Sequence, residues 1–257
     1  MYLRLPRPLI LEELGTEIEE LQTESALPVS ETDEDIILSK FGRSFPSTKE
    51  MSRFARERLD MEGGLDPTNA DGTLVRCLTR EEELFRALEK LVVEARLEEG
   101  FSGVDEFVSF SLSVNNRRKS RMGYALEHHL AALLDMRNLR YSRQAVTEGG
   151  NKPDFLFPGI EEYRDGNYTG DLAMLAAKSS LKDRWRQILV EAERIPDKHL
   201  CTLDQSISPH QVAEMGVQRA VLVIPEQLRA SYAPESRNRI MVVEEFIEFV
   251  EPFASRS

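Results

Sequence analysis

Several features that mark other protein classes are scarce in this chain of 257 residues. It has only two cysteines, Cys77 and Cys201, too few and too far apart for a disulfide framework or a zinc knuckle. No stretch approaches the roughly 18 uninterrupted apolar residues of a membrane span, and the start MYLRLPRPLILEELG lacks a signal-peptide cleavage region. These absences predict buried free thiols and a cytoplasmic protein of one or two domains with no membrane partner.

Positive charge is also in deficit, with 33 basic against 45 acidic side chains and a net charge of -12. Such a balance argues against nucleic acid, because phosphate binding rests on clustered Lys and Arg. However, residues 1–36 hold ten acids against two arginines and carry -8, which leaves -4 for the rest. We therefore predict an acidic N-terminal arm and linker over 1–43, mobile and solvated at 23–35, and one domain over 44–257.

The basic residues of the remaining chain concentrate in two segments. Residues 115–126 contain no acid, and their bases are Arg117, Arg118, Lys119 and Arg121. Residues 178–186 contain one acid, Asp183, and their bases are Lys178, Lys182, Arg184 and Arg186. Both segments are compatible with a polyanion partner, and a solvated helix face, which charge alone favours, is the alternative for each. Charge alone leaves the two interpretations open.

Hydrophobic periodicity predicts helices in the N-terminal part and strands after it. The predicted helices are 48–60, 80–98, a short one from 102 or 105 to 112, and 120–136 with Ser120 as its cap; a Gly- and Pro-rich loop occupies 61–72. The predicted strands are 139–146, 154–157, 172–178, 199–203 and 220–224, with helices at 182–194, 209–215 and 242–251. The pattern indicates a mixed α/β domain with a helical N-terminal part.

Charged residues at two strand ends point to chemistry. Asp154 opens the apolar strand DFLF, where an unpaired carboxylate is costly to desolvate, and Lys178 ends the strand 172–178. A Pro-Asp pair followed by such a lysine occurs in many nucleases, with a second acid two residues before the lysine. Here that position is Ala176. Glu191, thirteen residues after Lys178 on the predicted helix 182–194, is the candidate substitute.

Two carboxylates and an ammonium would then converge. Asp154 and Glu191 would hold Mg²⁺ through oxygen ligands, and Lys178 would orient or deprotonate the attacking water. This arrangement predicts metal-assisted phosphodiester hydrolysis. A structural salt-bridge cluster of the same residues is equally compatible with the spacing.

Beside these residues, Lys182, Asp183 and Arg184 carry groups that can read base pairs. Lys and Arg donate to the two acceptors of guanine in the major groove, and Asp accepts from the amino group of cytosine. The alternative is a solvated helix start, with Asp183 near the positive end of the helix and Trp185 packed inward.

Longer segments resemble a known family, the catalytic domains of EcoRII-like type II restriction endonucleases. The similarity lies in SVNNRRKSRMGYALEHHL (113–130), EGGNKPDFLFP (148–158), 176–195 and HLCTL (199–203), and extends from about residue 45 to about residue 250. It implies the PD-(D/E)XK fold, a central mixed β-sheet flanked by helices. It also implies a rearranged active site in which the acid before the lysine has moved to the following helix.

The resemblance assigns roles to individual residues. Asp154 and Glu191 would be metal ligands and Lys178 the catalytic lysine, with Glu127 and Tyr163 close to the site. For Glu127, a solvent-facing helix glutamate beside His128 is the alternative. The segment Lys182, Asp183, Arg184 would read CC:GG half-sites, and we expect phosphate contacts from the bases of 115–126 and from Arg186. The four histidines show no metal-ligand spacing, and we expect them to be surface or packing residues.

The implied function is Mg²⁺-dependent, sequence-specific cleavage of double-stranded DNA by a homodimer. Relatives of this type act on CCNGG or CCWGG sites, flip out the central bases and cut before the first C. Phe41, Phe45 and Phe54 are candidates to stack on a flipped base. Because only the acidic arm stands where EcoRII has an effector domain, we expect a stand-alone catalytic module. Two alternatives remain: a repair or structure-specific nuclease of the same fold, and a DNA-binding module without catalysis.

Overall fold

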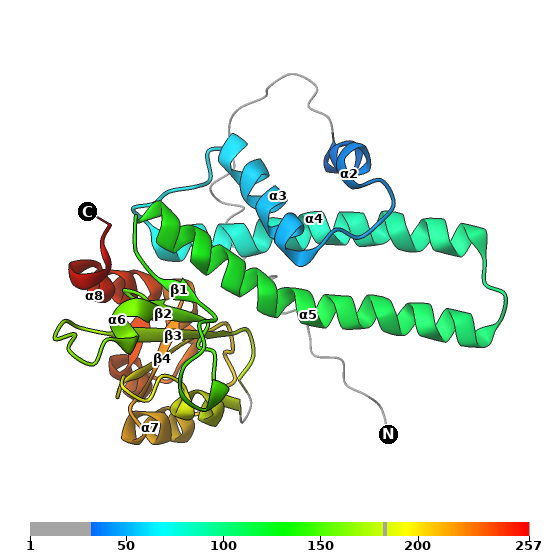
Figure 1. Cartoon of the computed structure of the whole chain (residues 1–257). Helices are drawn as coiled ribbons and strands as arrows, with labels where there is room; N and C mark the ends of the chain where they lie inside the picture. The colour runs from blue at the N-terminus through cyan, green and yellow to red at the C-terminus, as the bar shows by residue number, and fades with distance from the viewer. Residues whose placement is uncertain (1–31, 182–183, 257) are drawn as a thin grey trace. The chain divides into compact units, whose positions relative to one another are not determined.

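The computed structural model describes residues 32–181 and 184–256. The chain forms two compact units: a helical unit, Met1–Gly64 with Val75–Arg121, and a sheet unit, Leu65–Leu74 with Met122–Ser257 (Figure 1). The predicted helical part and the mixed α/β part are confirmed. The predicted boundary between residues 43 and 44 falls inside the helical unit, and residues 1–31 of the predicted arm lie outside the described residues.

The helical unit is built from helices with well-defined starts. Its elements are α2 (Asp33–Phe41), α3 (Thr48–Met61), most of α4 (Ala70–Glu99) and the first half of α5 (Val104–Met136). Ser47 caps α3: its hydroxyl accepts from the Glu50 N–H at 3.2 Å, while the Glu50 carboxylate accepts from the Ser47 N–H at 3.0 Å. The core joins Ile37 of α2, Phe54 of α3 and Leu84 of α4.

Two predictions for the N-terminal helices are wrong in detail. Residues 33–35, expected in a mobile linker, form the first turn of α2, because Thr32 caps it through the Asp35 N–H. Helix α4 begins at Ala70, inside the predicted loop 61–72, because the Asn69 side chain accepts from the Gly72 N–H at 2.8 Å. A short polar residue can therefore start a helix inside a loop-like sequence.

Helix α5 is continuous where two helices were predicted. No proline interrupts 104–136. Ser120 is not a cap, since its hydroxyl donates to the Arg117 carbonyl of the preceding turn at 3.3 Å. Lys and Arg are good helix formers, so the basic run continues the helix.

The sheet unit contains one six-stranded sheet in the order β1-β2-β3-β4-β5-β6. Strands β1 to β3 pair antiparallel and β3 to β6 pair parallel, so the predicted mixed sheet is confirmed. The elements are β1 (Ser142–Arg143), η1 (Glu148–Gly150), β2 (Phe155–Phe157), α6 (Ile160–Arg164), β3 (Ala173–Lys178), η2 (Arg184–Val190), β4 (Lys198–Thr202), α7 (Pro209–Val217), β5 (Ala220–Ile224), η3 (Glu226–Ser231), η4 (Pro234–Arg239), β6 (Ile240–Val242) and α8 (Val243–Ala254).

Differences from the predicted elements arise where the backbone turns. The predicted strand 139–146 shrinks to β1, because Gln144 adopts a left-handed φ of 47°. Residues 182 and 183 of the predicted helix 182–194 lie outside the described residues, and in 184–194 the structure has the 3₁₀ helix η2, which ends before Glu191. Strand β6 and helix α6 were not predicted, because three and five residues are too few to show a hydrophobic period.

Helix α8 packs its aromatic residues against the sheet. The Phe246 ring centroid lies 5.7 Å from that of Phe157 in β2 and 5.0 Å from that of His199 in β4. His199 is buried, burial lowers its pKa to about 4, and its packing role matches the expectation. Cys77 and Cys201 are buried free thiols, as predicted. Among the described helices, none has the length and apolar character of a membrane span.

Asp71 ties the first turn of α4 to the far end of the chain. Its buried carboxylate accepts from the N–H groups of Glu226 at 2.9 Å, Val243 at 3.0 Å and Glu244 at 3.0 Å. In return, the Glu244 carboxylate accepts from the Ala70 N–H at 2.9 Å. The starts of α4 and α8 therefore cap each other.

Replacing Asp71 by Ala is expected to lower the free energy of unfolding by about 2 to 4 kcal/mol, because buried N–H groups would lose their acceptor. Urea unfolding followed by circular dichroism measures the change. Asp60→Ala, at an exposed carboxylate that forms no hydrogen bond or ion pair with another described residue, is the control. An equal effect of the two substitutions would contradict the mutual capping.

Candidate active site

Asp154 stands immediately before β2, at the point where β2 runs beside the end of β3. The antiparallel register pairs Phe155 with Leu175, which brings the Asp154 side chain to the last residues of β3. Its Oδ2 accepts from the Ala177 N–H at 2.7 Å and from Lys178 Nζ at 2.8 Å. The other carboxylate oxygen has no hydrogen bond to any described residue, so it is available to a ligand.

Lys178 ends β3 with its side chain 29% exposed, whereas the Asp154 side chain is 11% exposed. The lysine is therefore the more exposed member of the ion pair. Ala176 is fully buried in β3 and supplies no carboxylate. Any second acid of the site must come from another segment, as the sequence suggested.

Glu191 remains the candidate for this second acid, but no helix presents it, contrary to the prediction. It follows η2 in a bend, with its N–H donating to the Ile188 carbonyl at 3.1 Å, so no helix face aims it. Burial raises the pKa of Glu191 to about 7; Asp154 adds to the rise, while Lys178 and Lys198 oppose it. Glu191 thus lies within electrostatic reach of the Asp154–Lys178 pair.

Lys198 holds the backbone at Glu191, a role that the sequence reading missed. Its buried Nζ donates to the carbonyls of Glu191 at 2.5 Å and Ala192 at 2.7 Å, and burial lowers the Lys198 pKa. Ala192 takes a left-handed φ of 47°, which turns the chain out of η2. A charged residue at the start of the buried strand KHLCT was the available signal, of the same kind that singled out Asp154.

The residues at this site fit a hard divalent cation. One oxygen of Glu191, Oε2, is buried without a hydrogen-bond partner, and the Asp154 and Glu191 carboxylates are the oxygen donors that Mg²⁺ prefers. No group of three or more His, Cys, Asp or Glu side chains suited to a metal occurs in 32–181 and 184–256. A cation here would complete its shell with water or substrate oxygens, which is usual for Mg²⁺.

Glu127 is connected to the backbone of Asp154 by hydrogen bonds through Gln144. Its nearly buried carboxylate, on α5, accepts from the Arg143 guanidinium and from Gln144 Nε2 at 3.0 Å. The Gln144 N–H donates to the Asp154 carbonyl at 3.3 Å, so Glu127 connects to Asp154 through one residue. The alternative of a solvent-facing helix glutamate is therefore wrong.

Tyr163, on α6, is buried in a neighbouring cluster. Its hydroxyl donates to Glu148 Oε2 at 2.5 Å and accepts from the Arg194 N–H at 3.3 Å. Burial raises the pKa of Tyr163 to about 12, and the same hydrogen bond lowers the pKa of Glu148. Within the described residues, Tyr163 is hydrogen-bonded to Glu148 and to Arg194, in the segment after Glu191, and not to Asp154 or Lys178.

The predicted base-reading residues are only partly visible. Lys182, Asp183 and the side chain of Arg184 lie outside what the structure describes. Trp185 is buried, as the alternative for this segment expected. Arg186 is exposed, pairs with Glu214 at 2.5 Å and lies over the Trp185 ring at 4.7 Å.

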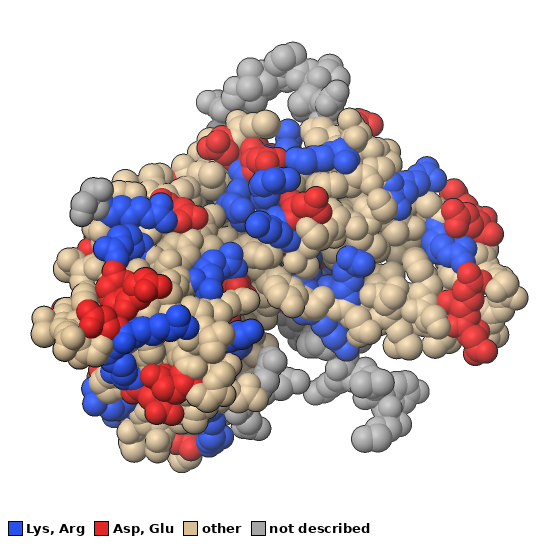
Figure 2. Space-filling model, viewed as in Figure 1, with Lys and Arg blue, Asp and Glu red and all other residues tan. Residues whose placement is uncertain are grey.

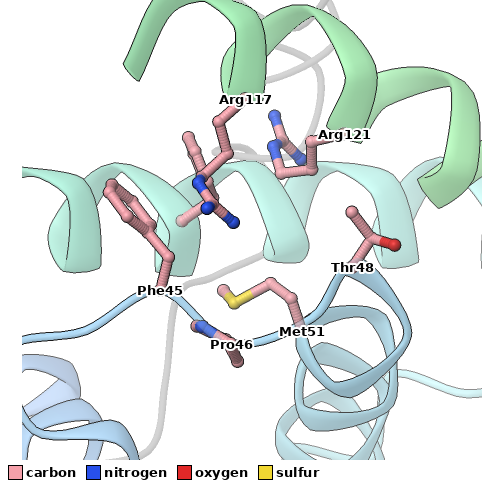
Figure 3. A pocket seen from close by; sticks show the side chains of 7 residues that line it. Phe45, Pro46, Thr48, Met51, Arg117 and Arg121 are labelled. Carbon is pink, nitrogen blue, oxygen red and sulfur yellow. The ribbon is translucent and has the colours of Figure 1, made fainter. Parts of the chain in front are cut away.

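The basic run of α5 has mixed uses within the helical unit. Arg121 is buried between Glu81 and Glu82, and Arg118 pairs with Glu89, so both guanidinium groups are committed to carboxylates. Arg117 reaches over the Phe45 ring at 4.6 Å (Figure 3). The pocket in Figure 3 is lined by Phe45, Pro46, Thr48, Met51, Phe85, Arg117 and Arg121.

Comparison with known proteins decides the family. Residues 85–247, well over half of the chain, match the protein family described as EcoRII C terminal. The chain belongs to this family. The type II restriction enzyme EcoRII of Escherichia coli is 41% identical over 205 residues, which cover 79% of this chain and 50% of that enzyme. The chain thus spans about half the length of this relative, and the family resemblance inferred from the sequence is confirmed.

Solved structures confirm the restriction-endonuclease fold. The restriction endonuclease PspGI, in complex with substrate DNA, aligns with a TM-score of 0.65 at 17% identity, over 89% of this chain and 97% of that one. Metal-depleted Ecl18kI with uncleaved, modified DNA aligns with a TM-score of 0.63 at 18% identity, over 86% of this chain and 83% of that one. This chain therefore has the fold expected from its family.

The raised pKa of Glu191 predicts a pH-dependent stability in metal-free buffer. The carboxyl pKa rises from 4.5 to about 7 on folding, so its contribution to stability is full below pH 4.5 and is lost as pH rises through 7. Glu191→Gln should match the wild type near pH 4.5 and exceed its free energy of unfolding by about 1 to 3 kcal/mol at pH 8. Glu193→Gln, at an exposed neighbour, is the control for thermal unfolding in chelator. The same pH response in both variants would contradict the burial of Glu191.

Proposed function

We propose that the protein is a type II restriction endonuclease that cleaves both strands of DNA at a specific sequence in the presence of Mg²⁺. The observation that carries the proposal is the ion pair of Asp154 with Lys178 at 2.8 Å, with Glu191 in electrostatic range. Membership of the EcoRII C-terminal family supports the choice of substrate.

In this proposal Asp154 and Glu191 hold the divalent cation. When bound, such a cation polarises a phosphate oxygen and lowers the pKa of bound water. Asp154 is suited to the task because one oxygen is fixed by the Ala177 N–H and Lys178 while the other has no described partner. Lys198 fixes the backbone of Glu191 through the carbonyls of Glu191 and Ala192, and the left-handed conformation of Ala192 sets the bend that follows.

Lys178 is the residue that meets the reacting phosphate. Asp154 fixes the position of its ammonium, and its partial exposure leaves N–H groups for a phosphate oxygen or for the attacking water. The increase of negative charge on the phosphate during attack is then opposed by a positive group already in position. Glu127 acts through Gln144 and Arg143 as a positioning residue, and Tyr163 positions the segment after Glu191.

Sequence reading is assigned to the segment that follows β3. Lys182, Asp183 and Arg184 carry donors and an acceptor suited to G·C pairs. The resemblance to the family further implies a CC(N/W)GG-like site cut before the first C. Exposed Arg186 is suited to the phosphates beside it. A near-palindromic site is matched by a homodimer with one active site for each strand.

The pocket of the helical unit favours Phe45 among the phenylalanines considered for base flipping. Phe54 is buried and packs edge-on against Phe41 at 5.2 Å, whereas Phe45 is partly exposed under Arg117. A flipped base stacks on aromatic rings and guanidinium planes, and Arg117 and Phe45 supply both. Arg118 and Arg121 are already paired with carboxylates, so phosphate contact from this run rests on Arg117 and on the exposed Lys119.

A digest of unmethylated plasmid DNA with Mg²⁺, followed by sequencing of the ends, tests the proposal. The expected result is fragments that share a CC(N/W)GG-like sequence and begin at its first C. Ends without a common sequence would favour a repair or structure-specific nuclease. Absence of cutting on many unmodified DNAs would favour a DNA-binding module without catalysis.

Asp154→Ala and Lys178→Ala are each expected to reduce the cleavage rate by about two to four orders of magnitude, since each removes a group from the reacting centre. Binding to the same DNA in Ca²⁺, measured by gel shift, should persist. The exposed Asp171→Asn serves as the matched control. Cleavage by Asp154→Ala at the wild-type rate would refute the site assignment.

A further inference from the structure

The loop that leads into β2 contacts the segment that carries Glu191. This loop, residues 147–151, contains η1, and both glycines of η1 have a left-handed φ, 63° and 77°. Glycine adopts such a φ at no steric cost, so the chain can turn back on itself here. The Thr147 N–H donates to the Asn151 carbonyl at 2.8 Å and closes the turn. The two ends of loop 147–151 therefore lie side by side.

Asn151 makes the shortest hydrogen bond between this loop and the Glu191 segment. Its side-chain Nδ2 donates to the carbonyl of Val190 at 2.9 Å and to the carbonyl of Glu148 at 2.9 Å. Both hydrogens of the amide are thus used, one within the loop and one on the residue before Glu191. A Cβ at Gly149 would lie 3.3 Å from Nδ2, so glycine there leaves room for the amide.

The same loop also binds the residues that follow Glu191. The Ala192 N–H donates to the Thr147 hydroxyl at 3.4 Å, and the Glu193 N–H donates to Glu148 Oε2 at 3.4 Å. With the bond from Asn151, backbone groups on both sides of Glu191 are therefore hydrogen-bonded to one short loop.

Loop 147–151 is also the stretch of chain that leads to Asp154. Asp154 follows Asn151 by three residues. One of the two residues between them is Pro153, which is buried and whose ring fixes its φ. The separation of Asp154 and Glu191 is thus governed by a short, restrained connection. Donors already held at a suitable separation bind a ligand more tightly, because less conformational freedom is lost on binding.

We propose that Asn151 is a positioning residue of the metal site, which fixes Glu191 relative to Asp154 through loop 147–151. The inference rests on the proposed function, in which these two carboxylates are the metal ligands. Lys198 donates to the Glu191 carbonyl from β4. Asn151 adds what Lys198 does not supply, a bond between the Glu191 segment and the loop that precedes Asp154.

Surface charge gives a cation little help on the sheet unit. Figure 2 shows acidic and basic side chains interspersed on the face of this unit that is in view. Opposite charges there offset each other, so the long-range attraction of a cation to that face is weak. Affinity for the cation then depends on how firmly its two carboxylates are held.

Binding of Mn²⁺ to the full chain without DNA, measured from the paramagnetic resonance signal of the free ion, tests the proposal. Asn151→Ala should raise the Mn²⁺ dissociation constant about tenfold or more, as is usual when a residue that orients a metal ligand is lost. Thr147→Val, which keeps the side-chain shape and removes the hydroxyl, should raise it by a smaller factor. Asn167→Ala, at an exposed side chain without a hydrogen bond to another described residue, is the matched control and should leave it unchanged.

Two further measurements separate positioning from a general loss of stability, both at a temperature at which each variant is folded by circular dichroism. Asn151→Ala should need about tenfold more Mg²⁺ for half-maximal cleavage, while its rate at saturating Mg²⁺ approaches that of the wild type, because Asp154 and Lys178 are unchanged. In chelator, hydrogen exchange at the Ala192 and Glu193 N–H groups should be faster in Asn151→Ala than in the wild type.

Equal Mn²⁺ dissociation constants for Asn151→Ala and Asn167→Ala would overturn the positioning role, even if the wild type cuts DNA at a specific sequence. A lower rate of Asn151→Ala at saturating Mg²⁺, with an unchanged Mg²⁺ requirement, would also overturn it. A wild type that binds Mn²⁺ in a manner that depends on Asn151, yet cuts no DNA, would support the positioning role and overturn only the proposed function.

Discussion

The hydrogen-bonded pair of Asp154 and Lys178 is the interaction on which the arrangement of the site depends. One carboxylate oxygen accepts from both the Ala177 N–H and Lys178 Nζ, so it fastens the start of β2 to the end of β3. A buried carboxylate is stable there only because these donors replace its water. The same contacts leave the lysine partly exposed and the second oxygen of Asp154 without a described partner.

Glu191, the second ligand of the proposed site, is costly to bury in the metal-free protein. Its Oε2 is buried without a hydrogen-bond partner, and its pKa rises to about 7 through burial, with a contribution from Asp154. Lys198 compensates on the backbone side by holding two carbonyls, not the carboxyl itself. The unfavourable free energy of desolvation therefore falls on the group proposed to bind a cation, as is common at functional sites.

The site residues were easier to predict than the local structure that presents them. Asp154 and Lys178 stand out because charged residues at the ends of buried strands need a reason, and strand pairing then brings them together. The helix expected to aim Glu191 is absent, because the bend depends on Lys198 and on the left-handed Ala192, and neither is visible as a pattern. Likewise Arg118 and Arg121 belong to a uniform basic run in sequence, but only tertiary structure reveals their carboxylate partners. The continuous α5 was missed because periodicity fails where a helix is polar all round.

The central claim is that Asp154 and Glu191, which belong to different segments, hold one divalent cation beside Lys178. Anomalous diffraction from crystals soaked in Mn²⁺ tests it most directly, because Mn²⁺ takes the oxygen ligands of Mg²⁺ sites and scatters anomalously. The account predicts a single strong peak contacted by both carboxylates. A peak contacted by Asp154 alone, or no peak at these residues in protein that cleaves DNA with Mn²⁺, would contradict it.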